Sequence, residues 1–380
     1  INFSYERGST CYAGETARMG GPARAAYPDR RQNMHQTAST RRTGGRRSDE
    51  RRRRRGERST MHRGRYIWRR TVFALVTVFV AVTLNFVLFR VLPGSAVSRM
   101  SRVPGASAEL KAALERQFGI DKPLWEQYLL YLKGLATGNL GVSFSNRQPV
   151  TTNLTEAFMN TLPLVLTGTL LALAIGIFLG ILSAVRRGSF FDHTMTNISV
   201  MFYAFPTQFL GAMLLIFFAG VLPSAGMADP FAVALSPSEQ FVDRLRHLIL
   251  PVATLTLTLY AEYLLIMRSS VLETLGEDYI LTARAKGLSR GRIIRSYSVR
   301  NAMLPTVTMI ALALGTVVSG AILIEVIYSW PGIGRELYQA VLQRDYPMLQ
   351  GGFLVITITV IAFNYLADLA YAWLDPRVSD

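Results

Sequence analysis

The sequence predicts an all-α membrane protein with six transmembrane helices. Apolar residues make up 50% of the 380 positions and charged residues only 17%, whereas a soluble domain usually carries about a quarter charged residues. The apolar residues gather in runs of about twenty, the length at which a helix crosses a bilayer core of roughly 30 Å. Helices are expected because an isolated strand cannot satisfy its backbone hydrogen bonds in lipid.

The expected spans are residues 71–91, 162–185, 197–221, 248–271, 303–327 and 351–374. Basic residues set their orientation, because short loops rich in Lys and Arg stay on the cytoplasmic side. Arg69 and Arg70 precede the first span, Arg186 and Arg187 follow the second, and the loop at 272–302 is strongly basic. Both termini are therefore expected to be cytoplasmic. The first apolar run is too long for the core of a signal peptide.

Two of the spans carry residues that affect how a helix packs. In the second span, small residues recur every fourth position, at Gly168, Ala172, Gly176 and Gly180. Such a seam allows another helix to approach closely. In the third span, Pro206 interrupts the apolar run and leaves a carbonyl that neighbouring groups or water must satisfy.

Composition divides the chain into four parts: an Arg-rich tail at 1–60, the first span at 61–92, an external loop at 93–160, and a core of five helices at 161–380. Residues 1–70 hold nineteen arginines against six acidic residues, so they carry +13 of the net charge of +16. The tail lacks the apolar periodicity of a folded domain and is expected to be disordered. It is either inert or associated with anionic lipid; nucleic-acid binding has no support from interleaved aromatic residues. Met61 is a candidate natural start.

The sequence offers no constellation that suggests catalysis, and we expect no enzyme. Cys11 is the single cysteine and the four histidines are scattered, which argues against a disulfide within the chain and against a metal site. There is no G-x-x-x-x-G-K-[S/T] loop, so the chain is not expected to bind ATP or another cofactor itself.

A polar segment between the fourth and fifth spans, residues 277–305, reads EDYILTARAKGLSRGRIIRSYSVRNAMLP. Its first half predicts a short helix that ends at Gly287, with Tyr279, Ile280 and Ala283 on one face. Small residues along the segment would let another protein approach the backbone closely. Basic residues at its edge could contact carboxylates, namely Arg284, Lys286, Arg290 and Arg292.

This segment resembles the cytoplasmic EAA loop of ABC-importer permeases, in the form found in the dipeptide/oligopeptide family. That form reads D-Y-x-R-T-A-R-A-K-G-L and then R-N-A-L-I-P, and the usual glutamate of the motif falls at Leu281. The resemblance implies a type I ABC-importer permease fold, in which this loop is a coupling helix that docks on an ATPase subunit. The implied coupling residues are Asp278, Tyr279, Thr282, Ala283, Arg284, Ala285, Lys286, Gly287 and Leu288. An ordinary solvated basic loop is the alternative.

Further motifs of the family lie outside this loop. The sequence from Glu325 to Gly334 resembles E-x-x-F-S-W-P-G-x-G, with Tyr328 at the usual Phe position, and Arg344 to Pro347 matches R-D-Y-P. The external loop resembles the family's segment between the first two spans, but Asn139 replaces its usual Asp. That replacement argues against a carboxylate-specific role there.

The resemblance also implies partners and a location. It implies a second homologous permease, two ATP-binding subunits that hold ATP and Mg²⁺, an extracytoplasmic substrate-binding protein, and contact with membrane lipid. The location is the cytoplasmic (inner) membrane of a prokaryote, crossed several times. The implied cargo is a di- or oligopeptide, and nickel, glutathione or haem are alternatives because relatives of similar sequence carry them. Rival hypotheses are an ion channel and a membrane-anchored scaffold whose tail binds lipid or nucleic acid.

Five residues are candidates for the translocation pathway. Thr254, Thr258 and Glu262 follow one another at i, i+4 and i+8, so a helix places them on one polar stripe. Glu262 would lie near mid-membrane, where an ionisable residue usually faces a cavity or a partner. Gln208 and Ser319 complete the set. Alternatively, Glu262 pairs with Arg268 or faces a neighbouring subunit.

Overall fold

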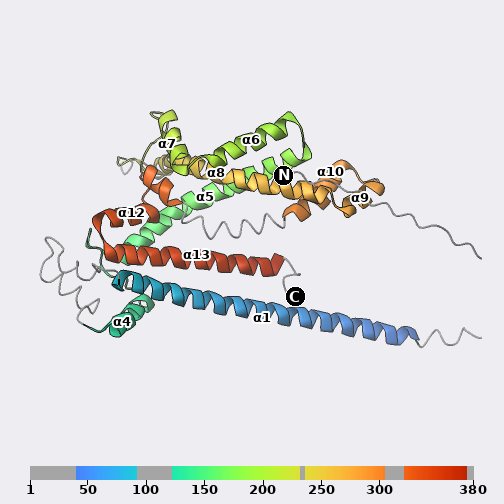
Figure 1. Cartoon of the computed structure of the whole chain (residues 1–380), viewed down its shortest axis with the longest axis horizontal. Coiled ribbons are helices and arrows are strands. Elements are labelled where there is room, and N and C mark those ends of the chain that lie inside the picture. Colours follow the sequence, from blue (N-terminus) through green and yellow to red (C-terminus); the bar gives the residue numbers. More distant parts are fainter. Residues whose placement is uncertain (1–39, 92–121, 232–235, 304–320, 375–380) are drawn as a thin grey trace, which may run out of the picture. The chain divides into compact units, whose positions relative to one another are not determined.

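The computed structural model describes residues 40–91, 122–231, 236–303 and 321–374 (Figure 1). The chain divides into two units, residues 1–61 and 62–380. The first unit supplies the beginning of helix α1 (Thr40–Val91), which therefore starts inside the tail that the sequence predicts to be disordered. All other described elements belong to the second unit.

The described residues of the second unit are mostly helical. Four helices are long and apolar enough to cross a membrane: α1 from Gly64, α5 (Val150–Val185), α8 (Pro237–Leu275) and α13 (Tyr346–Leu374). Shorter helices lie between them: α4 (Leu124–Ala136), α6 (Phe190–Ala204), α7 (Thr207–Phe217), α9 (Asp278–Ala285), α10 (Arg290–Arg292) and α12 (Ile333–Gln343). Most of the predicted fifth span, 303–327, lies outside the described residues. The helical part of the prediction is thus confirmed, while the number six stays a prediction.

The predicted third span is not one straight helix. Helices α6 and α7 occupy this region and meet at an angle of 105°, so they form either one broken span or a re-entrant loop. The break falls at Phe205 and Pro206, where Phe205 has an extended backbone (φ −74°, ψ 132°). A residue before proline avoids the helical region for steric reasons, and proline has no N–H to continue the ladder. The interruption expected at Pro206 is confirmed, while a membrane span at 197–221 stays a prediction.

Helix α8 begins eleven residues before the predicted fourth span, within residues 222–247, which were expected to connect the third and fourth spans outside the membrane. Ser236 caps the helix: its side chain accepts from the Glu239 N–H, and the Glu239 side chain accepts from the Ser236 N–H. This reciprocal arrangement is a capping box, and Pro237 follows at the first helical position, where proline is favoured. The signal S-P-S-E was present in the sequence, but the prediction did not use it.

Helices α5 and α8 pack side by side along their length and form the centre of the second unit (Figure 1). Gly176 and Gly180 of α5 face the backbone of α8, because a Cβ at Gly176 would lie 2.7 Å from the Tyr260 carbonyl oxygen, and one at Gly180 would lie 2.7 Å from that of Leu264. The close approach predicted from the small-residue seam is confirmed. Close backbone contact is a main source of helix association in lipid.

Two polar joints attach α6 and α7 to this pair. The Arg268 guanidinium of α8 donates to both carboxylate oxygens of Asp192 on α6, at 2.6 and 2.8 Å. At α7, the Tyr328 hydroxyl donates to the Gly211 carbonyl at 3.1 Å and shares a 2.8 Å hydrogen bond with Thr254 of α8. Buried polar groups thereby obtain partners, and the broken α6–α7 pair is held on α8.

The remaining long helices meet around α13. Its first turns join α5 and α12 in a buried apolar cluster of Val150, Leu154, Ala157, Ile333, Leu337, Ala340, Met348 and Leu349. Helix α1 lies beside α13, where Asn85 donates to the Gln350 carbonyl at 3.0 Å and Thr71 hydrogen-bonds with Tyr365 at 2.7 Å (Figure 1). Near its end, α1 also packs on α4, through Phe86 against the ring of Tyr128.

The glycine seam gives a test of the α5–α8 contact. We expect Gly176→Ala to destabilise the protein by about 1–3 kcal/mol, because the new methyl group meets backbone that cannot move aside. Gly64→Ala in α1, where nothing lies within 4 Å, should instead stabilise by up to about 1 kcal/mol through helix propensity. Thermal unfolding of both purified variants measures the effect. Equal shifts in the two variants would contradict the close packing.

Candidate functional site

The polar segment after α8 begins with helix α9, which has a well-defined start and stop. Asp278 lies in the first turn and Arg284 in the last, so both charges suit the helix dipole. At the end, the Gly287 N–H donates to the Arg284 carbonyl at 2.9 Å and the Leu288 N–H to the Ala283 carbonyl at 3.3 Å. This is a Schellman motif, which requires a left-handed residue, and Gly287 has φ +74°. The predicted helix and its stop at Gly287 are confirmed.

One face of α9 is buried. Ile280 is fully buried and Ala283 is 3% exposed, and both pack with Ile293 from the π-helical turn Ile293–Ser298. Tyr279 and Leu288 cover the edge of this cluster. Ala283 is therefore part of the internal packing, whereas the resemblance had placed it among the residues that meet a partner.

The opposite face of α9 is exposed and combines an apolar centre with charged edges. Leu281 is 60% exposed. Arg284 lies one turn further on, and Asp278, Thr282, Ala285 and Lys286 are also exposed. We call Leu281, Arg284 and Ala285 the α9 outer face. A large exposed apolar side chain with a charged rim is typical of a surface that contacts another protein.

The segment is attached to the ends of α5 and α8. Arg290 of α10 donates to the Val185 carbonyl at 3.0 Å, where α5 ends. Ser298 shares a 2.6 Å hydrogen bond with Thr274 near the end of α8. A cleft of about 630 Å³ lies between these helix ends and the segment, with Arg187, Leu272 and Arg284 in its lining. Short polar contacts thus connect this segment with both central helices.

Thr254, the first of the predicted pathway residues, is fully buried. Its hydroxyl donates to the Leu250 carbonyl at 2.9 Å and hydrogen-bonds with Tyr328. In this conformation the hydroxyl joins helices, and no solvent path reaches it. The hydroxyl of Thr258, one turn on, donates to the Thr254 carbonyl at 2.9 Å and is half-buried.

The other predicted pathway residues are not brought together with Thr254. Glu262 is half-buried, and it makes no hydrogen bond or ion pair within the described residues. Arg268 pairs with Asp192, so the alternative pairing of Glu262 with Arg268 is wrong. Gln208 is exposed at the start of α7, and Ser319 lies outside the described residues. The role of these side chains in a pathway stays a prediction.

The structure adds a buried carboxyl group to which the sequence analysis gave no role. Glu325 is fully buried. It accepts from the Thr161 hydroxyl at 2.7 Å and from the backbone N–H groups of Gly334 and Arg335 at 2.7 and 3.1 Å. It thus caps α12 and joins it to α5. A Cβ at Gly332 would lie 2.3 Å from this carboxyl group, which explains why the motif E-x-x-Y-S-W-P-G needs a glycine there.

Comparison with known proteins identifies the family. Residues 176–380 match the family described as binding-protein-dependent transport system inner membrane component, and residues 64–165 match its N-terminal counterpart. The chain belongs to this family. It is 40% identical over 334 residues to the dipeptide transport system permease protein DppB of Escherichia coli, covering 82% of this chain and 98% of that protein.

Two other members of the family show the same coverage, 82% of this chain and 98% of the relative. The di/tripeptide transport system permease protein DppB of Pseudomonas aeruginosa is 37% identical over 329 residues. The glutathione transport system permease protein GsiC of Escherichia coli is 34% identical over 316 residues. The predicted membership of the peptide-permease family of ABC importers is confirmed, and the chain is a multi-pass membrane component of such a transporter.

The attachment of the polar segment can be tested in this permease through Arg290. Arg290→Gln removes a positive charge and a hydrogen bond from the end of α5, together worth about 1 kcal/mol. We expect the amides of α9 to exchange with deuterium about five-fold faster, which corresponds to that loss. Arg292→Gln, in the same turn and equally classed as exposed but not bonded to Val185, is the matched control. Equal exchange in the two variants would mean that Arg290 does not anchor the segment.

Proposed function

We propose that this chain is a permease subunit of an ATP-driven importer of di- and oligopeptides. In this proposal it crosses the inner membrane six times, with both termini in the cytoplasm, and forms half of the translocation pathway beside a second homologous permease. Two ATP-binding subunits hold and hydrolyse ATP with Mg²⁺, and an extracytoplasmic binding protein delivers the peptide. Support comes from the family and from the relatives named for dipeptide and di/tripeptide transport.

The observation that carries the coupling proposal is the two-sided construction of α9. Its inner face is buried against Ile293, and the following residues Arg290 and Ser298 attach the segment to α5 and α8. Its outer face exposes Leu281 beside Arg284. We propose that the ATP-binding subunit receives this outer face. When ATP draws those subunits together, α9 moves with them as a rigid body and carries the ends of α5 and α8 along. Packed helices respond to such a motion by changing between discrete arrangements.

For the pathway, the proposal retains Thr258, Glu262, Gln208 and Ser319 as side chains that face the peptide in one of these arrangements. Thr254 would have to leave its hydrogen bond with Tyr328 before it could contact a substrate. Glu262 is suited to a peptide ammonium group, because its carboxyl group has no cationic partner within the described residues.

Glutathione is a second candidate substrate, since one relative is named for its transport and is 34% identical to this chain. Glutathione is itself a small peptide derivative, so the two candidates require similar contacts. The identity to the dipeptide relative is higher, at 40%, and we therefore favour dipeptides. Nothing in the geometry favours nickel, haem, an ion channel or a scaffold.

The coupling proposal predicts the effect of placing a charge on the α9 outer face. Leu281→Asp should lower affinity for the ATP-binding subunits by about ten-fold or more, the loss expected when a central apolar contact at an interface is removed. Leu342→Asp on α12 is the control, because Leu342 is equally exposed, at 61%. Co-purification and stimulated ATP hydrolysis measure the effect. Normal assembly of the Leu281 variant would overturn the docking proposal.

The substrate proposal is tested with the complete transporter in proteoliposomes. We expect ATP-dependent uptake of a labelled dipeptide, and we expect excess unlabelled dipeptide to compete more strongly than glutathione at equal concentration. The same complex without its binding protein is the control and should show little uptake. Stronger competition by glutathione would reassign the substrate while leaving the transporter class intact.

A further inference from the structure

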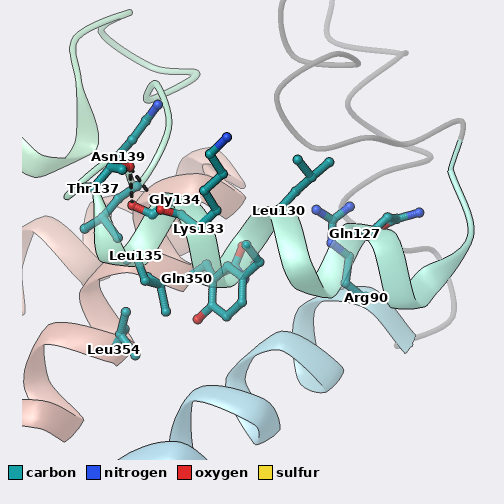
Figure 2. A pocket seen from close by; sticks show the side chains of 13 residues that line it. Arg90, Gln127, Leu130, Lys133, Gly134, Leu135, Thr137, Asn139, Gln350 and Leu354 are labelled. Carbon is teal, nitrogen blue, oxygen red and sulfur yellow. Dashed lines mark hydrogen bonds between the residues drawn. The ribbon is translucent and has the colours of Figure 1, made fainter.

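A pocket lined by polar and apolar side chains lies at the C-terminal end of α1, where α4 and the beginning of α13 meet it (Figure 2). Its volume is about 300 Å³, which is at the lower end of the range for small-ligand sites. The residues that matter here are Arg90 from α1, Gln127, Tyr131 and Lys133 from α4, and Gln350 from α13. Its lining shares no residue with the α9 segment or with the predicted pathway residues that the structure describes.

A buried side chain in this pocket leaves an acceptor unused. Gln127 is only 6% exposed, and its Nε2 donates to the Lys122 carbonyl at 2.8 Å. This bond fixes the orientation of the amide, and Oε1 then has no partner in the described part of the chain. Nε2 of Gln350 also makes no hydrogen bond of good geometry within the described residues, although this amide lies near the Tyr131 hydroxyl. Buried polar atoms of this kind normally have partners.

Two basic side chains belong to the described lining of the pocket. Figure 2 shows Arg90 extending from α1 beside Gln127, with Lys133 further along α4. Burial raises the pKa of Tyr131 to about 12, so its hydroxyl stays neutral at physiological pH and can donate or accept. The pocket thus combines two cationic groups with an unpaired amide acceptor and an unpaired amide donor. A ligand that matches it has an anionic group and a separate hydrogen-bond donor.

The position of the pocket indicates where such a ligand comes from. Arg90 is the last residue of the apolar span that starts at Gly64, so the pocket lies at the level where a membrane helix ends. Leu84, Val87 and Leu88 of the preceding turns are exposed, and this apolar surface can accept acyl chains. Arginine at a span end reaches the interfacial region, where lipid phosphates lie.

We propose that this pocket binds the headgroup of a phospholipid that carries both a phosphate and a hydrogen-bond donor, as phosphatidylethanolamine and phosphatidylglycerol do. The phosphate contacts Arg90 and Lys133 through charge-assisted hydrogen bonds. The ammonium or glycerol hydroxyl of the headgroup donates to Oε1 of Gln127. Phosphatidylcholine has the phosphate but no such donor, so it would leave Oε1 of Gln127 without a hydrogen bond.

The test uses the full chain purified with its partner subunits, stripped of lipid and titrated with each of the three phospholipids while native mass spectrometry counts bound molecules. Phosphatidylethanolamine and phosphatidylglycerol should bind about five-fold or more tightly than phosphatidylcholine, as one added hydrogen bond predicts. Lys133→Gln should weaken all three lipids, whereas Gln127→Met should remove the preference over phosphatidylcholine. Lys122→Gln, on the same part of the chain but outside the pocket lining, should leave binding unchanged.

Three outcomes would overturn the proposal. Equal binding of the three lipids to the unmodified chain would mean that acyl chains alone hold them. Equal affinities in the Lys133 and Lys122 variants would exclude the phosphate contact. Displacement of the lipid by inorganic phosphate or by a dipeptide would show that the pocket takes a soluble anion instead. None of these readouts depends on transport, so they leave the proposed function untouched.

Discussion

The close backbone contact between α5 and α8 is the constraint on which the rest of the second unit depends. There is no hydrophobic driving force between helices in a membrane, because lipid tails are as apolar as the side chains. Helices there associate through tight packing and hydrogen bonds. Gly176 and Gly180 allow the two backbones to approach where any Cβ would collide with a carbonyl oxygen. Because α6, α7 and α12 all attach to this pair, its geometry sets their positions.

The attachments of α6 and α12 use buried carboxyl groups in addition to apolar packing, whereas α7 is attached through hydroxyl groups. Asp192 pairs with Arg268 and also accepts from the Gly188 N–H. Glu325 and Asp345 each accept backbone N–H groups at the start of a following helix. A buried carboxyl group that lost such partners would destabilise the fold strongly. The joints therefore hold each short element rigidly on a long one, which is what transmission of a motion requires.

The α9 segment shows how such rigidity produces a surface that can contact a partner. Its inner residues pack together, and contacts from Arg290 and Ser298 attach it to α5 and α8. The outer face is therefore already ordered before a partner binds. Preorganised surfaces bind with less entropic loss than flexible ones. Leu281 stands where the general permease motif has a glutamate and the peptide-permease form has an arginine, so an apolar side chain occupies that position here.

The sequence by itself determined the helical membrane class, the ends of α9 and the family, because these depend on local signals: long apolar runs, a glycine at a left-handed position and ordered motifs. It also indicated the seam of α5. It placed the interruption at Pro206 but not the 105° angle there, and it missed the early start of α8, which the capping box at Ser236 marks. Only the tertiary structure decided that Thr254 is buried against Tyr328, that Arg268 pairs with Asp192, and that Gln127 lines a polar pocket. These facts depend on residues far apart in the chain, and a side chain's partner is fixed by the packing of whole helices, which periodicity within one helix does not specify.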